Sequence, residues 1–281
     1  MLKAIGRLDN ASIRELDTLL EDIHKYVKEN KRKKAVEAIN KTAKTPNYFI
    51  REYMGKKMTG FENRELVSSI AEDMLKHKIY GIRATGLFYF YNLYFKEPQK
   101  LFPYLEKNFE NIHWEAESII NELWKRHPKI MKVEMLKWIK DENENKRALS
   151  FHGMENIAGK DPGYIMDFLT HAIDDESIEV QKKITHILTQ VARSRPAESY
   201  PYIREWLLDA DETRLKTLWV SMKKLANIVI QKSKRDKTQE FIMLTQRTIK
   251  DWRKDENKNV SSMGNKLNQI LNNNHNGRTF R

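Results

Sequence analysis

Apolar residues recur along most of this chain with the spacing of amphipathic helices. In the segment DDESIEVQKKITHILTQVARSRP, the residues Val180, Ile184, Ile187, Leu188 and Val191 fall on one face of a helix. The whole chain has only 10 glycines and 7 prolines, which are too few for the many turns of a strand-rich protein. The pattern therefore predicts an all-α fold.

Four of the prolines recur at a nearly constant interval. Pro98, Pro128, Pro162 and Pro196 are 30, 34 and 34 residues apart, and a period in this range is typical of stacked helical repeats. The seventh and eleventh residues after each proline are apolar, which gives one buried stripe on a helix that begins at the proline. These apolar pairs are Leu105/Phe109, Met135/Ile139, Leu169/Ile173 and Ile203/Leu207.

A second helix is expected after each of these first helices, over residues 114–124, 146–157, 178–191 and 213–225. An earlier pair is expected over 62–76 and 81–94, so that about five pairs cover residues 62–226. Further helices, over 12–29, 32–45, 238–253 and 260–272, would cover the two open ends of the stack, because the last repeats of a solenoid otherwise expose their apolar face.

The sequence thus predicts an α-α superhelix, or solenoid, of about five to seven HEAT-like helix pairs. The expected organisation is a single domain over 1–281, with a basic N-terminal helical cap (1–60), the repeats (61–230) and basic C-terminal helices with a frayed tail (231–281). A non-repetitive helical bundle would bury the same stripes and is the alternative. A solenoid differs because it presents its second helices as one concave surface, which suits an extended partner.

The net charge of +12 is concentrated at the two ends of the chain. Residues 1–60 hold 14 basic and 8 acidic residues and residues 231–281 hold 12 and 5, whereas 61–230 is nearly balanced with 25 and 26. The absence of cysteine excludes a disulfide framework and a thiolate nucleophile. Neither terminus carries an apolar stretch long enough to span a membrane or to act as a signal peptide, so we expect a cytoplasmic protein. We also expect a monomer.

Three short segments resemble the HEAT-like DNA alkylation-repair family, whose founding members are bacterial DNA glycosylases that remove alkylated purines. The resemblance spans about residues 60–226. NIHWEAESIINELW is similar to the family helix in which a Trp is followed four residues later by an essential Asp. NKRALSFHGM is similar to its Arg-bearing helix, and DDESIEVQKKITHILTQVARSRPAE resembles the helix that carries a second Trp.

The match at the functional positions of this family is partial. Trp114 and Arg147 match the first Trp and the Arg, whereas Ser118 stands at the position of the Asp and His186 at that of the second Trp. In the family, the carboxylate is held to stabilise the positive charge that develops on the sugar, a role that a hydroxyl group fills poorly. Glu117 is the local catalytic candidate, although one residue along a helix turns a side chain by about 100°. The resemblance implies a diverged DNA-binding member whose glycosylase activity is undecided.

Basic side chains on the predicted second helices would extend the DNA contact, because phosphate contacts give binding that depends on salt and not on base sequence. Two alternatives stay open: a non-catalytic binder of branched or bent DNA, and a protein-interaction scaffold on which these charges only solvate helix faces. No histidine spacing, glycine-rich loop or nucleophile elbow suggests a metal or a cofactor, and we expect none. The expected DNA-binding residues are Trp114, Ser118, Arg147, His186, Arg83, Lys182, Lys183, Arg214 and Lys216.

Overall fold

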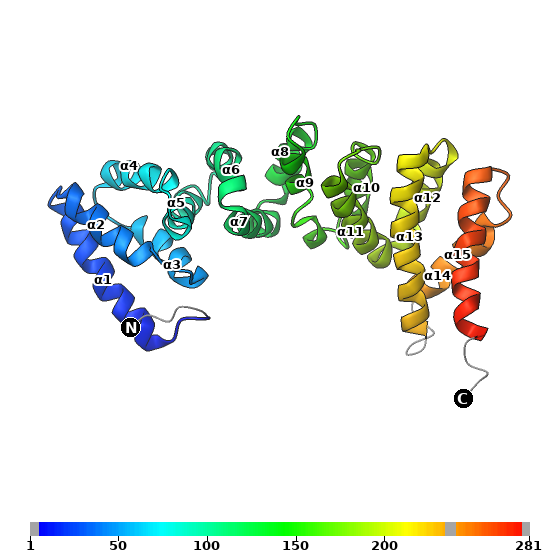
Figure 1. Cartoon of the computed structure of the whole chain (residues 1–281), viewed down its shortest axis with the longest axis horizontal. Helices are drawn as coiled ribbons and strands as arrows, with labels where there is room; N and C mark the ends of the chain where they lie inside the picture. The colour runs from blue at the N-terminus through cyan, green and yellow to red at the C-terminus, as the bar shows by residue number, and fades with distance from the viewer. Residues whose placement is uncertain (1–5, 234–239, 277–281) are drawn as a thin grey trace. The chain divides into compact units, whose positions relative to one another are not determined.

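The computed structural model describes residues 6–233 and 240–276, and these residues form fifteen α-helices and three short 3-10 helices without any strand (Figure 1). The predicted all-α class is confirmed. In the described ranges no helix is both long enough and apolar enough to cross a membrane.

The chain divides into two compact units, Met1–Leu123 and Trp124–Arg281, and the boundary falls inside α7. The prediction that residues 1–281 form one domain stays a prediction. The N-terminal unit contains α1 (Asn10–Lys28), α2 (Arg32–Ala43), α3 (Tyr48–Met58), α4 (Arg64–Leu75), α5 (Tyr80–Leu93), η1 (Pro98–Lys100), α6 (Phe102–Asn108), η2 (Phe109–Asn111) and most of α7 (His113–Arg126). The C-terminal unit contains α8 (Pro128–Trp138), α9 (Glu144–Ser150), η3 (Met154–Asn156), α10 (Pro162–Thr170), α11 (Ile178–Ser194), α12 (Pro196–Leu208), α13 (Glu212–Ser233), α14 (Glu240–Trp252) and α15 (Lys258–Asn276).

Successive helix pairs of the C-terminal unit stack side by side. Helix α8 packs on α9, α10 on α11, α12 on α13 and α14 on α15. The second helices α9, α11, α13 and α15 also pack one against the next, as do the first helices α10, α12 and α14; Figure 1 shows α13 and α15, in yellow and red, as neighbours. This two-layer order is the one that the repeat in the sequence predicts.

Each repeat proline begins a helical segment. Pro128, Pro162 and Pro196 lie in the first turn of α8, α10 and α12, and Pro98 begins η1. Proline suits this position because its φ angle is already helical and because the first turn leaves N–H groups unpaired in any case. All eight residues of the predicted apolar pairs are buried, as are the five apolar residues of the stripe on α11.

Asp161 joins the cap of α10 to the neighbouring helix α8. Its carboxylate accepts a hydrogen bond from the backbone N–H of Tyr164 (3.3 Å) and forms an ion pair with Lys132. The Lys132 ammonium group, together with the N–H of Tyr164, holds the pKa of Asp161 below its usual value of 3.8. A carboxyl whose pKa is lower in the folded chain stabilises the fold above the pKa of the unfolded chain, and this stabilisation is lost as the pH falls through the lower folded value.

We therefore expect Asp161→Ala to lower the free energy of unfolding by about 1 kcal/mol near pH 7. The difference from the unchanged chain should shrink as the pH falls below the ordinary carboxyl pKa, because protonation then removes the same charge from the unchanged chain. Urea unfolding of both chains at neutral and at acidic pH measures this difference. A difference that stays constant over the range would show that the charge of Asp161 does not contribute.

The N-terminal unit contains α3, a helix that the sequence pattern did not predict. Only Ile50, Met54 and Met58 form an apolar stripe on it. The stripe is hard to recognise because Arg51 and Gly55, beside it, are buried as well. A Cβ atom on Gly55 would lie 2.5 Å from the Cβ of Phe88, so α3 and α5 approach closely enough to require glycine there.

Two other helices end at residues that differ from the predicted ones. The helix expected over 146–157 stops at Ser150, because Gly153 adopts a left-handed conformation with a φ of 81° and η3 follows. Helix α15 continues to Asn276, beyond the expected end at residue 272. Residues 277–281 of the expected frayed tail lie outside the described residues, as do 234–239.

Candidate functional site

Helix α7 carries an exposed aromatic side chain in its first turn. Trp114 is 67% exposed, whereas Trp124 and Trp138 are fully buried. The centre of the His113 ring lies 5.2 Å from that of Trp114. Indole rings are usually largely buried in proteins, so the exposure of Trp114 makes this surface of the N-terminal unit a candidate for contact with a partner.

Ser118, one turn further along α7, is half-buried and faces α3. Its hydroxyl group shares a hydrogen bond of 2.8 Å with the hydroxyl group of Tyr48. The Tyr48 ring packs edge-on against Phe88 at 5.2 Å between ring centres, and burial raises the pKa of Tyr48. At neutral pH this part of α7 therefore presents two neutral hydroxyl groups, and the expected correspondence of Ser118 to the carboxylate of the family stays a prediction.

A buried ion pair lies directly beside Trp114. The carboxylate of Glu115 is fully buried and accepts hydrogen bonds from the Arg51 guanidinium of α3 and from the Tyr80 hydroxyl of α5. Arg51 also donates to the carbonyl of Thr45 at 3.1 Å. Burial, and next the bond to Glu115, raises the pKa of Tyr80 well above its ordinary value, so its hydroxyl group remains a donor. These contacts fix the first turn of α7, and with it the backbone of Trp114, to two other helices.

Other carboxyl groups lie near Ser118. Glu117, the candidate from the sequence, is half-buried on α7. Glu52 lies one turn after Tyr48 on α3, just as Glu122 lies one turn after Ser118 on α7. Burial raises the pKa of Glu52, and the charge of Glu122 raises it further. Glu52 is not predicted from the sequence, because α3 itself is not.

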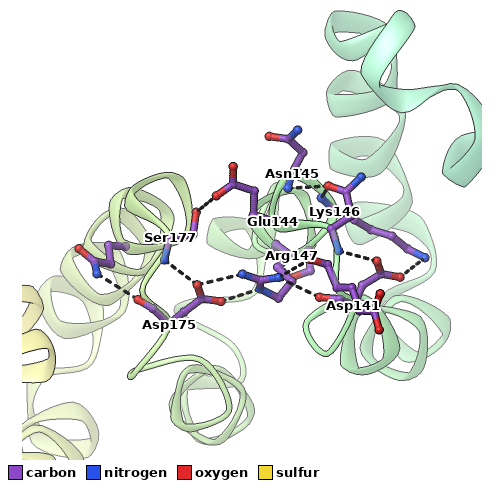
Figure 2. A network of polar contacts seen from close by, with 11 residues as sticks. Asp141, Glu144, Asn145, Lys146, Arg147, Asp175 and Ser177 are labelled. Atoms are coloured by element: carbon purple, nitrogen blue, oxygen red, sulfur yellow. Dashed lines mark hydrogen bonds and ion pairs between the residues drawn. The ribbon is translucent and has the colours of Figure 1, made fainter.

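In the C-terminal unit, Arg147 is engaged by several acceptors at once (Figure 2). Its Nε and Nη2 atoms donate to the two carboxylate oxygens of Asp175, at 2.7 and 3.2 Å. Its Nη1 atom donates to the carbonyls of Asp141 and Glu142, both at 2.9 Å. Asp141 also pairs with Lys146 at 2.8 Å. Arg147 therefore ties α9 to the turn before α11.

Arg83 repeats this arrangement in the N-terminal unit. It donates to the carbonyls of residues 77 and 78, and to the carbonyl of Asn111, which lies 28 residues further along the chain. The carboxylate partner of Arg147 also lies 28 residues ahead. Arg214 is held by Asp174 and Asp209, at 2.6 and 2.8 Å. The three arginines thus join consecutive repeats, a role that the sequence pattern does not distinguish from DNA contact.

The remaining candidates lie on α11 and α13, which pack against each other. His186 and Lys216 are exposed, Lys183 is half-buried, and Lys182 pairs with Glu179 at 2.6 Å. After Glu212, α13 has no acidic residue, and its exposed face carries Lys216, Lys223 and Lys224. The candidates are thus divided: Arg83, Trp114, Glu117 and Ser118 lie in the N-terminal unit, and Arg147, Lys182, Lys183, His186, Arg214 and Lys216 in the C-terminal unit. Their assembly into one site stays a prediction.

Across the described part of the chain, no group of three or more histidine, aspartate or glutamate side chains is placed to hold a metal ion.

Comparison with known proteins identifies a family for most of the chain. Residues 50–225 match the sequence model of the DNA alkylation repair enzyme family. No curated protein sequence matches the chain. Among solved structures, an engineered protein of the Northeast Structural Genomics Consortium is 10% identical, with a TM-score of 0.34 over 85% of this chain and 84% of its own. A second engineered protein is 12% identical, with a TM-score of 0.27 over 90% and 96%. Both similarities are too low to support a conclusion.

Proposed function

The chain belongs to the DNA alkylation repair enzyme family, which supports a role in DNA repair, and on this premise we propose that it binds duplex DNA through the backbone. The observation that carries the proposal furthest is the face of α13, on which Lys216, Lys223 and Lys224 are exposed without a carboxylate on the same helix after Glu212. Lysine side chains that neutralise phosphates release counterions, so such a face favours a polyanion.

The exposed Trp114 ring supports a second kind of contact. An indole ring held at a fixed helix start provides a large, rigid surface for a sugar or a base at low entropic cost. Because Glu115 anchors this helix start to α3 and α5, the ring is presented from a fixed backbone. We assign to Trp114 the contact with a lesion or distortion, and to His186 a weaker stacking contact of the same kind.

For Arg147, the contacts favour a supporting role. Its ion pair with Asp175 and its two carbonyl partners satisfy most of its donors, so a phosphate would have to compete with them. In this proposal Arg147, Arg83 and Arg214 hold the repeats in register. Lys182, Lys183 and Lys216 reach the phosphates, since lysine recognises phosphate as a mobile point charge.

The chemistry of base release is the part of the family function that this chain fits least. The hydroxyl group of Ser118 is bonded to Tyr48 and brings no negative charge to a positively charged transition state. We expect at most slow release of alkylated purines from methylated DNA, and we expect Glu117→Gln to abolish whatever release occurs. Chromatography of the freed bases measures it, with the exposed Glu65→Gln as the matched control. Release that is unchanged in Glu117→Gln would remove Glu117 from the mechanism.

The hydrogen bond between Ser118 and Tyr48, which leaves no negative charge at Ser118, also supports a second candidate function. This function is non-catalytic binding of branched or bent DNA. Such a protein needs the basic face and the exposed ring but no carboxylate near the sugar. It would bind a four-way junction more tightly than a linear duplex of the same sequence, and it would release no base. Competition between the two DNAs for the protein distinguishes this candidate from a glycosylase.

A further inference from the structure

The N-terminal unit has an open pocket of about 510 Å³ that the proposed function does not use. Its walls come from one face of α3, from the end of α5 and from the segment before α1. The volume is within the usual range for sites that bind small molecules, roughly 300–1,000 Å³. The lining residues are Arg7, Leu8, Phe49, Glu52, Tyr53, Lys56, Tyr91 and Asn92.

The aromatic side chains and the Asn92 amide that line this pocket are held in place by contacts with neighbouring residues. The Tyr53 hydroxyl donates to Asp17 at 2.7 Å, and the Asn92 side chain donates to the carbonyl of Phe88 at 2.7 Å.

Phe49 packs edge-on against Tyr48 at 5.5 Å and Tyr91 against Phe95 at 5.7 Å, measured between ring centres. With these walls already ordered, little entropy is lost when a ligand enters the pocket.

The charged side chains of the pocket, unlike the aromatic and amide side chains, are not held by neighbouring groups. Within the described part of the chain, the side chains of Arg7, Glu52 and Lys56 form no hydrogen bond or ion pair with another residue, although the charge of Lys56 acts to lower the pKa of Glu52. Glu52 and Lys56 are one helical turn apart on α3. Glu52 is half-buried, whereas Arg7 and Lys56 are exposed to solvent. Rigid aromatic walls beside unengaged charges of both signs suit a ligand that combines a flat ring with an anionic group.

We propose that this pocket binds a nucleotide unit, with the base against Phe49, Tyr53 and Tyr91 and the phosphate at Lys56 and Arg7. The Glu52 carboxyl accepts a hydrogen bond from an amino group of the base, and the Asn92 side-chain oxygen accepts a second one. Two cations against one carboxyl leave the pocket positive when all three are ionised, which suits a phosphate. A free nucleotide and a nucleotide extruded from DNA share this chemistry. Binding of an extruded nucleotide rests on the proposed function, whereas binding of a free nucleotide does not.

The test has two arms, both made on the whole chain. In the first arm, 2′-deoxyadenosine 5′-monophosphate is titrated into the protein by calorimetry. In the second arm, binding to a duplex that carries one 7-methylguanine is compared with binding to the same duplex without it. Each arm uses Lys56→Ala and Glu52→Gln, with Lys41→Ala as the control, since Lys41 is an exposed lysine of α2 outside the pocket.

A free nucleotide as ligand predicts binding of the monophosphate that weakens at least about 10-fold in Lys56→Ala and is unchanged in Lys41→Ala. An extruded nucleotide predicts no binding of the monophosphate, but a preference for the methylated duplex that falls in both pocket variants. If the monophosphate does not bind and the pocket variants match the control with both duplexes, the proposal is overturned. Even then, binding of the unmethylated duplex would still support the proposed function. If this duplex did not bind either, the proposed function would be contradicted as well.

Discussion

Replacing Glu115 by alanine is expected to lower the free energy of unfolding of the N-terminal unit by about 3–5 kcal/mol. The substitution removes the partner of Arg51, whose side chain is only 8% exposed and whose Nε atom already has no hydrogen-bond partner. A buried guanidinium group without a carboxylate carries the full cost of its lost hydration. The Tyr80 hydroxyl loses its acceptor in the same substitution.

Urea unfolding of the whole chain, followed by far-ultraviolet circular dichroism, measures this effect. The matched control is Glu62→Ala, because Glu62 pairs with Lys28 on the surface of the same unit with both side chains more than half exposed. An exposed pair contributes about 0–1 kcal/mol. Equal losses in the two variants would show that the pair of Arg51 and Glu115 is not a principal anchor of α7.

Reversing three charges on α13, with Lys216→Glu, Lys223→Glu and Lys224→Glu together, is expected to weaken duplex binding roughly 100-fold or more near 50 mM salt. The three lysines lie on one exposed helical face, where steps of seven and eight residues return to the same side. Losing three phosphate contacts should also reduce the slope of log K against log salt by about 3.

The control for this triple variant reverses three exposed lysines at the other layer of the C-terminal unit, Lys129, Lys250 and Lys254. Lys129 and Lys250 belong to the first helices α8 and α14, and Lys254 follows α14. Both variants change the net charge by the same amount, so a general electrostatic effect would weaken binding equally in both. Only a contact made by the α13 face predicts a loss that is specific to the first variant.

The helix pairs of the C-terminal unit could be predicted from sequence because their signals are local. A proline at the first turn and apolar residues at fixed steps from it identify α8, α10 and α12 without knowledge of any distant contact. The end of α9 could not be predicted in this way. Gly153 is tolerated in a helix as well as in a turn, and only its φ of 81° shows that the chain turns there.

The candidate site was predictable only in part, because its decisive contacts join residues far apart in the chain. Trp114 was identified through the family resemblance, and its side chain is exposed in the structure. The partner of Glu115 lies 64 residues away on α3, and nothing in the local sequence links the two. Arg147 was identified through the family resemblance alone, whereas its bonds to Asp175 and two carbonyls show what it does within the fold.

Fluorescence anisotropy of a labelled duplex at about 50 mM and about 200 mM salt measures whether the protein binds the DNA backbone. A protein of this family that grips the DNA backbone should bind tightly at the lower concentration, with an affinity that falls by several orders of magnitude at the higher one if six or more phosphates are contacted. Absence of binding near 50 mM salt, where affinity for the backbone is greatest, would contradict the claim.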